Sequence, residues 1–169
     1  PWPVVCPTGA WVADQHLVHG PLAHWAHTRA DVIALDDGHM RLTYAALHDA
    51  VCRQAQTLQL QQAPATVFVD DSLSTIHQMV AFLAIIRSGR CAAVTDPDWP
   101  LAVREGVQAV FEPAPTDMPA PTPHTPFYIG FTSGSTGSPK GFRRHHQSWT
   151  ESLRVCLDTF GEAAATRVL

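Results

Sequence analysis

The sequence carries little charge for its length: 15% of its 169 residues are charged, and the formal net charge is −4 at pH 7. A nucleic-acid-binding protein needs a basic surface that neutralises phosphates, so we expect no nucleic-acid partner. No stretch reaches the ~20 consecutive apolar residues of a membrane-spanning helix, and no signal peptide is evident. We therefore expect a cytoplasmic protein with no membrane span.

Cysteine is scarce and dispersed. The four cysteines, Cys6, Cys52, Cys91 and Cys156, form no CxxC pair, which favours reduced thiols. Cys52 and Cys91 lie in apolar patterns and are predicted to be small core residues.

Histidine is more frequent, with ten residues. His16 and His19, like His24 and His27, are three residues apart and could place two ligands on one helix face. No cysteine or carboxylate completes either set, so we predict no metal site in this chain.

Glycine and hydroxyl residues are concentrated in one run, residues 132–141, with the sequence TSGSTGSPKG. It follows residues 127–131 (FYIGF), an apolar segment typical of a buried strand. Residues 148–151 (SWTE) come after it and predict a capping box at the start of a helix. A strand, a glycine loop and a helix in this order can present backbone N–H groups to a phosphate.

The residue types in this run suit a polyphosphate. Glycines let the backbone approach closely, hydroxyls donate hydrogen bonds, and lysine supplies a mobile positive charge. The candidate phosphate-binding residues are Thr132, Ser133, Gly134, Ser135, Thr136, Gly137 and Lys140. A Walker A loop is disfavoured, because it needs Gly-Lys-Ser/Thr and here Pro139 precedes Lys140. A flexible linker would explain the glycines, but it would explain neither the buried strand nor the Pro-Lys-Gly ending.

Basic side chains gather after the run, and two interpretations of them stay open. The residues are Lys140, Arg143, Arg144, His145 and His146. They form either an exposed basic turn or a positive rim around a polyphosphate. For the two histidines the surface turn is favoured.

Alternating strand and helix patterns predict an α/β fold, with a mostly parallel sheet flanked by helices and phosphate binding at the carboxyl end of strand 127–131. A helical pattern near 17–26 contains Gly20-Pro21, which starts or kinks it. The further elements are a hairpin at 32–42, helices at 43–60, 73–86 and 100–107, and strands at 67–69 and 91–94.

The predicted organisation has four parts. Residues 1–13 form an extended arm, 14–111 an α/β subdomain, 112–126 a proline-rich connector, and 127–169 a strand, phosphate loop and helix that start the next subdomain.

The glycine-rich run with its preceding strand resembles the phosphate-loop signature of the adenylate-forming (AMP-binding) enzymes, which include acyl-CoA synthetases, peptide-synthetase adenylation domains and luciferase. Residues 41–47 (RLTYAAL) are similar to their early LTYxEL element. Residues 82–89 (FLAIIRSG) and 96–100 (DPDWP) are similar to their second element. Two features depart from the family: a shorter, proline-rich 100–126 segment and an aromatic Phe142.

The resemblance implies the first part of the large N-terminal domain of such an enzyme, truncated at residue 169 and inactive by itself. It implies an ATP-dependent acid–thiol ligase that forms an acyl-adenylate from a carboxylic acid, releases pyrophosphate, and transfers the acyl group to CoA or carrier-protein phosphopantetheine. ATP and Mg²⁺ would be required, with most Mg²⁺ ligands elsewhere, and an acyl-carrier protein is a further expected partner. Lys140 would be catalytic and offset leaving-group charge. The alternative is a non-catalytic, truncated module that binds a nucleotide or a partner.

Overall fold

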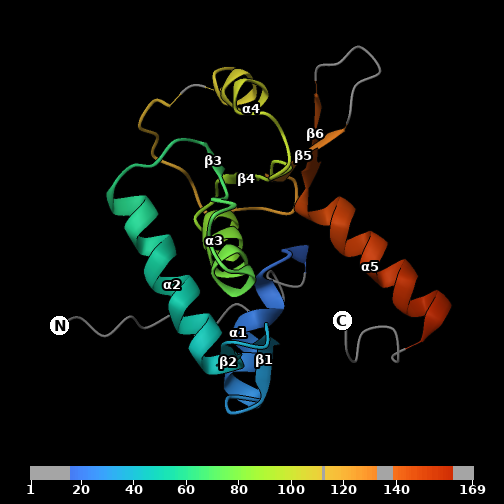
Figure 1. The fold of residues 1–169 in the computed structure, drawn as a ribbon. Coiled ribbons are helices and arrows are strands. Elements are labelled where there is room, and N and C mark those ends of the chain that lie inside the picture. The colour runs from blue at the N-terminus through green and yellow to red at the C-terminus, as the bar shows by residue number, and fades with distance from the viewer. Residues whose placement is uncertain (1–15, 112, 133–138, 162–169) are drawn as a thin grey trace.

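The computed structural model describes residues 16–111, 113–132 and 139–161. Its centre is a four-stranded sheet in the order β3-β4-β5-β6 (Figure 1). Strands β3 (Thr66–Phe68), β4 (Cys91–Ala93) and β5 (Pro126–Thr132) are parallel, and β6 (Lys140–His145) runs antiparallel to β5 at one edge. The predicted α/β fold with a mostly parallel sheet is confirmed.

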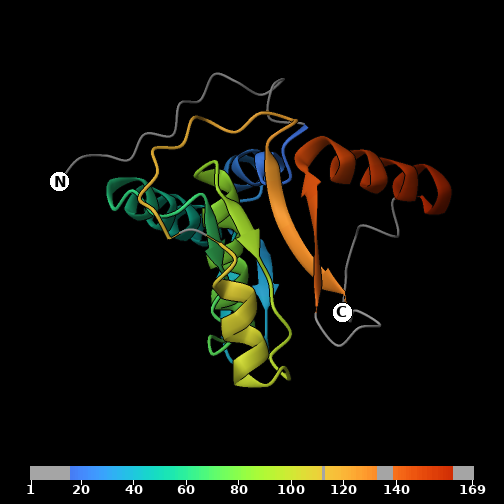
Figure 2. The same ribbon diagram turned by 90° about the horizontal axis from the view of Figure 1, so that it is seen from above.

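Five helices accompany the sheet in the described part of the chain. They are α1 (Gly20–Thr28), α2 (Tyr44–Leu60), α3 (Thr75–Arg87), α4 (Leu101–Gln108) and α5 (His146–Phe160). Helices α1, α2 and α3 pack against one another, and α5 projects from the end of β6 (Figures 1 and 2).

Local capping explains where the first helices begin. Thr43 caps α2 by accepting a hydrogen bond from the amide of Ala46, and Ser74 caps α3 in the same way through the amide of His77. Helix α1 starts at Gly20 with proline in its first turn, so the Gly20-Pro21 pair begins this helix and does not kink it.

A separate two-stranded hairpin precedes α2. Strands β1 (Ile33–Asp36) and β2 (Arg41–Thr43) pair antiparallel around a turn in which Gly38 has φ +83°. The Asp36 carboxylate accepts a hydrogen bond from the Gly38 amide at 3.0 Å. The predicted hairpin and its Asp-Gly turn are confirmed.

The core lies on both faces of β4, as the two-residue period of a strand requires. Ala92 packs towards α3, in a cluster with Ile86 and Phe127. Cys91 and Ala93 belong to a different cluster, which contains Ile129 and is covered by Phe111, just past α4. Cys91 and Cys52 are both buried, as predicted.

The proline-rich segment is tied to the sheet by a buried arginine. Residues 113–125 form no helix or strand. The Arg90 guanidinium, whose residue is 1% exposed, donates hydrogen bonds to the carbonyls of Ala63, Ser88 and Thr116. The predicted arm at 1–13 lies outside the described residues, and the division into four parts stays a prediction.

Candidate functional site

The glycine-rich run begins at the carboxyl end of β5, where an α/β sheet places ligands. Thr132 pairs with Lys140 across the β5–β6 hairpin, and the Thr132 hydroxyl donates to the Lys140 carbonyl at 3.4 Å. Both residues are exposed. We call this pair the loop mouth. The other candidate residues, Ser133, Gly134, Ser135, Thr136 and Gly137, lie outside the described residues.

The loop mouth leads into a strand and not into a helix, so the predicted order of strand, loop and helix is wrong. Strand β6 carries the chain back along β5 until His145 pairs with Pro126. Six residues at ~3.3 Å each separate the mouth from the first residue of α5, a distance of about 20 Å. Figure 2 shows α5 at the opposite end of the hairpin. The positive end of the α5 dipole is therefore too far from the loop mouth to act on it, because this effect is confined to the first turn.

The capping box predicted at 148–151 is also wrong, because the cap is a histidine three residues earlier and the helix begins at His146. The His145 ring nitrogen Nδ1 accepts a hydrogen bond from the Ser148 amide at 3.2 Å. The Ser148 hydroxyl donates back to the His145 carbonyl at 2.8 Å, while Glu151 accepts from the Gln147 amide group at 2.7 Å. Histidine takes the role that serine was predicted to have.

The basic residues after the loop divide into two groups. Arg144 donates to the hydroxyl and the carbonyl of Ser148 at 3.1 and 3.2 Å, and its guanidinium carbon lies 5.7 Å from the centre of the Trp149 ring. It therefore holds the β6–α5 junction together. Lys140 and Arg143 are exposed on β6 and are the described positive charges nearest in sequence to the loop. A positive rim, if present, rests on these two side chains.

His146 is fully buried, which contradicts the surface turn predicted for it. Its Nδ1 accepts a hydrogen bond from the Val18 amide at 3.1 Å, and its ring stacks on Phe127 with centroids 4.8 Å apart. Burial, followed by the charge of His145, lowers the pKa of His146 to about 4. Burial, followed by the charges of His146 and Arg87, lowers the pKa of His19 to about 3. Both rings are neutral at pH 7 and serve the fold.

An aromatic contact at the base of the loop mouth was not predicted from the sequence. The Trp99 ring lies edge-on to Phe131, with centroids 5.6 Å apart and planes at 74°. Phe131 in turn lies against Gly141, where an added β-carbon would be 3.2 Å from Cε1 of the ring. The sequence signal was a tryptophan in a proline-bounded turn after β4, but nothing in the pattern identified its partner.

The hydroxyl of Thr132 and the ammonium of Lys140 at the mouth suit phosphate oxygens better than a metal ion. In the three described ranges there is no group of three or more histidine, cysteine, aspartate or glutamate residues that could hold a metal. We therefore assign no Mg²⁺ ligand in this part of the chain. The same ranges contain no helix with the length and apolar character needed to cross a membrane.

The glycine-rich run lies within a match to a known protein family. The family model described as AMP-binding enzyme matches residues 99–169, which include the entire glycine-rich run. The chain thus carries, in residues 99–169, a segment of the adenylate-forming, or AMP-binding, enzyme superfamily. Within this superfamily it is 40% identical over 77 residues to an uncharacterized acyl-CoA ligase, YhfT, of Bacillus subtilis, an alignment that spans 45% of the chain and 16% of the relative.

A second relative aligns along nearly all of the chain. Nonribosomal peptide synthetase 6 of Alternaria brassicicola is 29% identical over 194 residues, which span 90% of the chain and 13% of the relative. Among solved structures, PA1221, a nonribosomal peptide synthetase protein containing adenylation and PCP domains, superposes with a TM-score of 0.66 at 20% identity. That match covers 86% of the chain and 35% of PA1221, and it shows the fold. The chain thus spans less than a fifth of either curated relative.

Proposed function

We propose that this chain supplies the phosphate-binding part of an ATP-dependent ligase that converts a carboxylic acid into an acyl-adenylate and releases pyrophosphate. The observation that carries the proposal is the glycine- and hydroxyl-rich run, with its only lysine, at the carboxyl end of a buried strand. The match of residues 99–169 to the adenylate-forming superfamily supports it.

In the proposed reaction a carboxylate attacks the α-phosphorus of ATP, and the bond to the pyrophosphate oxygen breaks. The barrier is high because an anion approaches a polyanion, so positioned donors and positive charge are the main catalytic means. We assign the β- and γ-phosphates to the backbone amides and hydroxyls of residues 132–137. The Lys140 ammonium offsets the charge that develops on the leaving pyrophosphate. Mg²⁺, when bound, would neutralise the phosphates further.

The acyl group then passes to a thiol, and we propose CoA or carrier-protein phosphopantetheine as the acceptor. The support is that one relative is named an acyl-CoA ligase and that the solved structure of PA1221 contains a PCP domain beside its adenylation domain. These names do not decide between the two acceptors for this chain.

Lys140→Ala tests the proposal in the protein that carries this chain. We expect labelled pyrophosphate to exchange into ATP when the correct carboxylic acid is present, and Lys140→Ala to slow this exchange by about 10²–10³-fold, the effect of removing one donor to a developing negative charge. Binding of the acid should change much less.

Two variants control this measurement. Lys140→Arg keeps the positive charge and should retain more activity than Lys140→Ala, while Arg154→Ala removes an exposed charge from α5 and should leave exchange unchanged. An exchange rate that Lys140→Ala does not alter would contradict the role of Lys140. Nucleotide binding with no exchange for any acid in a broad panel would favour a non-catalytic binding module.

A further inference from the structure

Few contacts within the loop mouth hold its two residues together. Its two residues are exposed, and the hydrogen bond from the Thr132 hydroxyl to the Lys140 carbonyl is long at 3.4 Å. Exposed hairpin ends with few buried contacts open easily. A site that must hold phosphate oxygens in fixed positions therefore needs support from neighbouring elements.

Support comes from the turn that follows β4. The Trp99 ring contacts Phe131, the residue before Thr132, with centroids 5.6 Å apart. The Phe131 ring lies against Gly141, the residue after Lys140. One aromatic stack therefore touches both strands of the hairpin one residue below the loop mouth.

The turn that presents Trp99 is ordered by its own hydrogen bonds. Asp96 accepts from the Asp98 amide through its carboxylate at 3.0 Å and from the Trp99 amide through its carbonyl at 3.2 Å. Such an Asx turn fixes the backbone without help from other elements.

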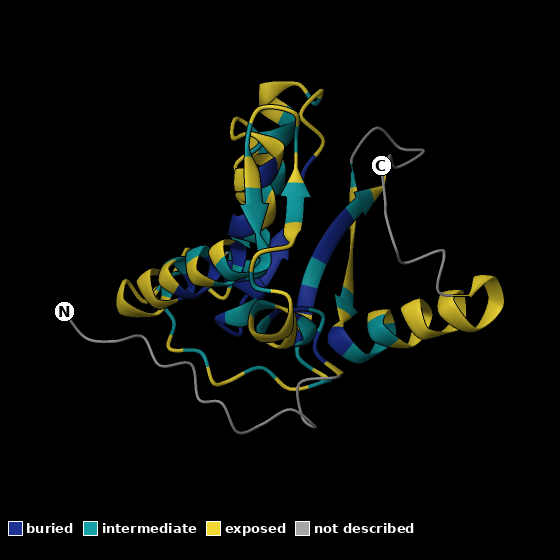
Figure 3. Ribbon diagram, turned by 90° about the horizontal axis from the view of Figure 1, so that it is seen from below, coloured by how far each residue is buried: buried dark blue, intermediate teal, exposed yellow. Residues whose placement is uncertain are grey.

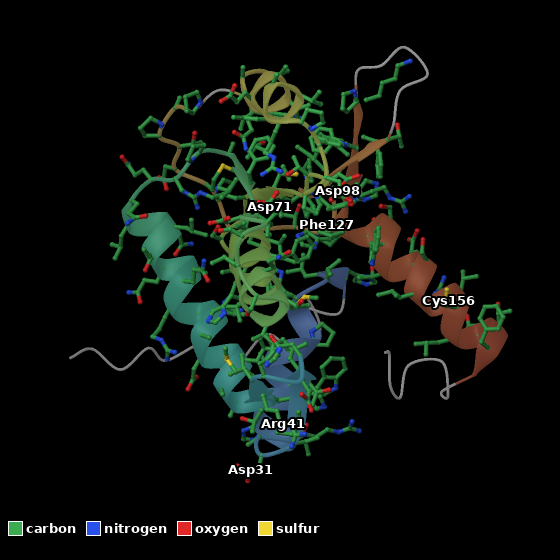
Figure 4. The ribbon with its side chains drawn as sticks, in the orientation of Figure 1. Asp31, Arg41, Asp71, Asp98, Phe127 and Cys156 are labelled. Atoms are coloured by element: carbon green, nitrogen blue, oxygen red, sulfur yellow. The ribbon has the colours of Figure 1, made fainter. Side chains whose placement is uncertain are left out.

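Arg104 of α4 attaches this turn to the rest of the sheet. Its guanidinium donates to the Pro97 carbonyl at 2.8 Å and pairs with the Asp71 carboxylate at 2.8 Å. Asp71 lies shortly after β3, and Figure 4 labels it together with Asp98 of the turn. Both charged groups are partly shielded, with side-chain exposures of 26% and 23%, so the pair is less screened than a surface one.

We propose that Trp99 is a positioning residue for the phosphate loop: it presses Phe131 against Gly141 and so keeps Thr132 and Lys140 in register. The proposal rests on the proposed function, because the register matters for catalysis only if the loop holds ATP. Trp99 is assigned no contact with substrate. Its effect reaches the loop through Phe131 and the hairpin.

A single lysine in the sequence gives this proposal a direct test. The 169-residue chain labelled with ¹⁵N-lysine should give one backbone amide resonance, that of Lys140. We expect an order parameter near ~0.85, typical of rigid backbone, and a fall towards ~0.6 in Trp99→Leu. Trp99→Phe keeps an aromatic ring and should restore most of the order. Trp25→Leu, which removes a half-exposed ring from α1, is the matched control and should have no effect.

The same resonance reports nucleotide binding. Titration with MgATP should shift it in the wild type, and Trp99→Leu should weaken the apparent affinity by about three- to tenfold, the range expected for an aromatic pair. If MgATP does not shift the wild-type resonance, the proposed function loses its support, but the order parameters still decide whether Trp99 supports the hairpin.

Either of two results would overturn the proposal: a Lys140 amide that is already mobile in the wild type, or one that stays rigid in a folded Trp99→Leu protein. If circular dichroism shows that Trp99→Leu is unfolded, Arg104→Gln takes its place. This variant removes the donor to Pro97 and the partner of Asp71, so it loosens the turn that holds the Trp99 ring against Phe131. Increased motion of Lys140 in Arg104→Gln supports the proposal, and unchanged order overturns it.

Discussion

Helices α3 and α5 have similar lengths, 13 and 15 residues, but opposite environments. Helix α3 has six buried residues, whereas α5, which is described along its whole length, has His146 alone. Figure 3 shows the contrast, with α5 largely exposed along its length. Burial in the described part of the chain is therefore concentrated around α3, and α5 is attached mainly through its first turn.

The difference does not come from a lack of apolar residues in α5. Trp149, Leu153, Leu157 and Phe160 share one helix face and are 38–70% exposed. An apolar stripe therefore predicts that a segment is helical, but it does not say which part of a protein covers the stripe. In α3 the stripe meets α2 and β4.

Truncation of one side chain in each helix should give the largest contrast. Ile86 of α3 is 0% exposed, and Ile86→Ala is expected to lower the free energy of unfolding by about 2–5 kcal/mol, through lost burial and a cavity. Leu153 of α5 is 50% exposed, and Leu153→Ala should cost about 0.5 kcal/mol or less. Urea unfolding of the 169-residue chain measures both. Equal losses would contradict the comparison.

Lowering the pH should reduce the free energy of unfolding through His146, the single buried residue of α5. Below pH 6.5 both His146 and His19 bind a proton in the unfolded chain. In the native state His146 binds one only near pH 4 and His19 only near pH 3. The free energy of unfolding therefore falls as pH drops through this window, by about 2–4 kcal/mol at pH 5. The charged groups facing the pair are Arg87 and His145, and both oppose further positive charge.

His146→Asn isolates this effect. Asparagine cannot be protonated in this range, yet its side-chain oxygen can still accept the hydrogen bond from the Val18 amide. The slope of stability against pH between 6.5 and 5 should fall by less than half, because His19 and the partly buried His48, whose pKa burial also lowers, still contribute. His39→Asn, in the exposed hairpin turn, is the control. An unchanged slope in His146→Asn would show that this ring does not govern acid stability.

The first half of the fold was largely predictable because its local signals agree with its packing. The hairpin, α2 and α3 were expected within a few residues, since apolar periodicity and glycines indicated these elements and the caps seen in the structure agree with them. Strand β6 was missed because its sequence, KGFRRH, has four basic residues, counting the histidine, and suggested a turn. Charged residues are common on edge strands, where they discourage pairing with other chains.

The sequence predicted the motif of the candidate site, but it did not predict how the surrounding helices and strands are arranged. The glycine-rich run placed the loop after β5, but the position of α5 depended on the missed strand. The cap at His145 was missed because serine, threonine, aspartate and asparagine are the usual caps. The contacts of Phe131 with Trp99 and of His146 with Val18 join segments distant in sequence, and only the tertiary structure reveals them.

Two glycines provide the test with the smallest expected effect on the comparison between the packed part of the fold and α5. Gly38 of the hairpin turn and Gly161, which follows α5, have φ of +83° and +73°, and an added β-carbon at either position meets nothing within 4 Å. Alanine would therefore be strained by its backbone alone, by about 1–2 kcal/mol. We expect Gly38→Ala to lower the free energy of unfolding by about 1 kcal/mol, because the hairpin is packed with α2 and unfolds with the core. Gly161→Ala should cost less than half of this, since a nearly unburied helix end can fray instead of bearing the strain. Equal losses in urea unfolding would mean that α5 unfolds together with the core, despite its exposure.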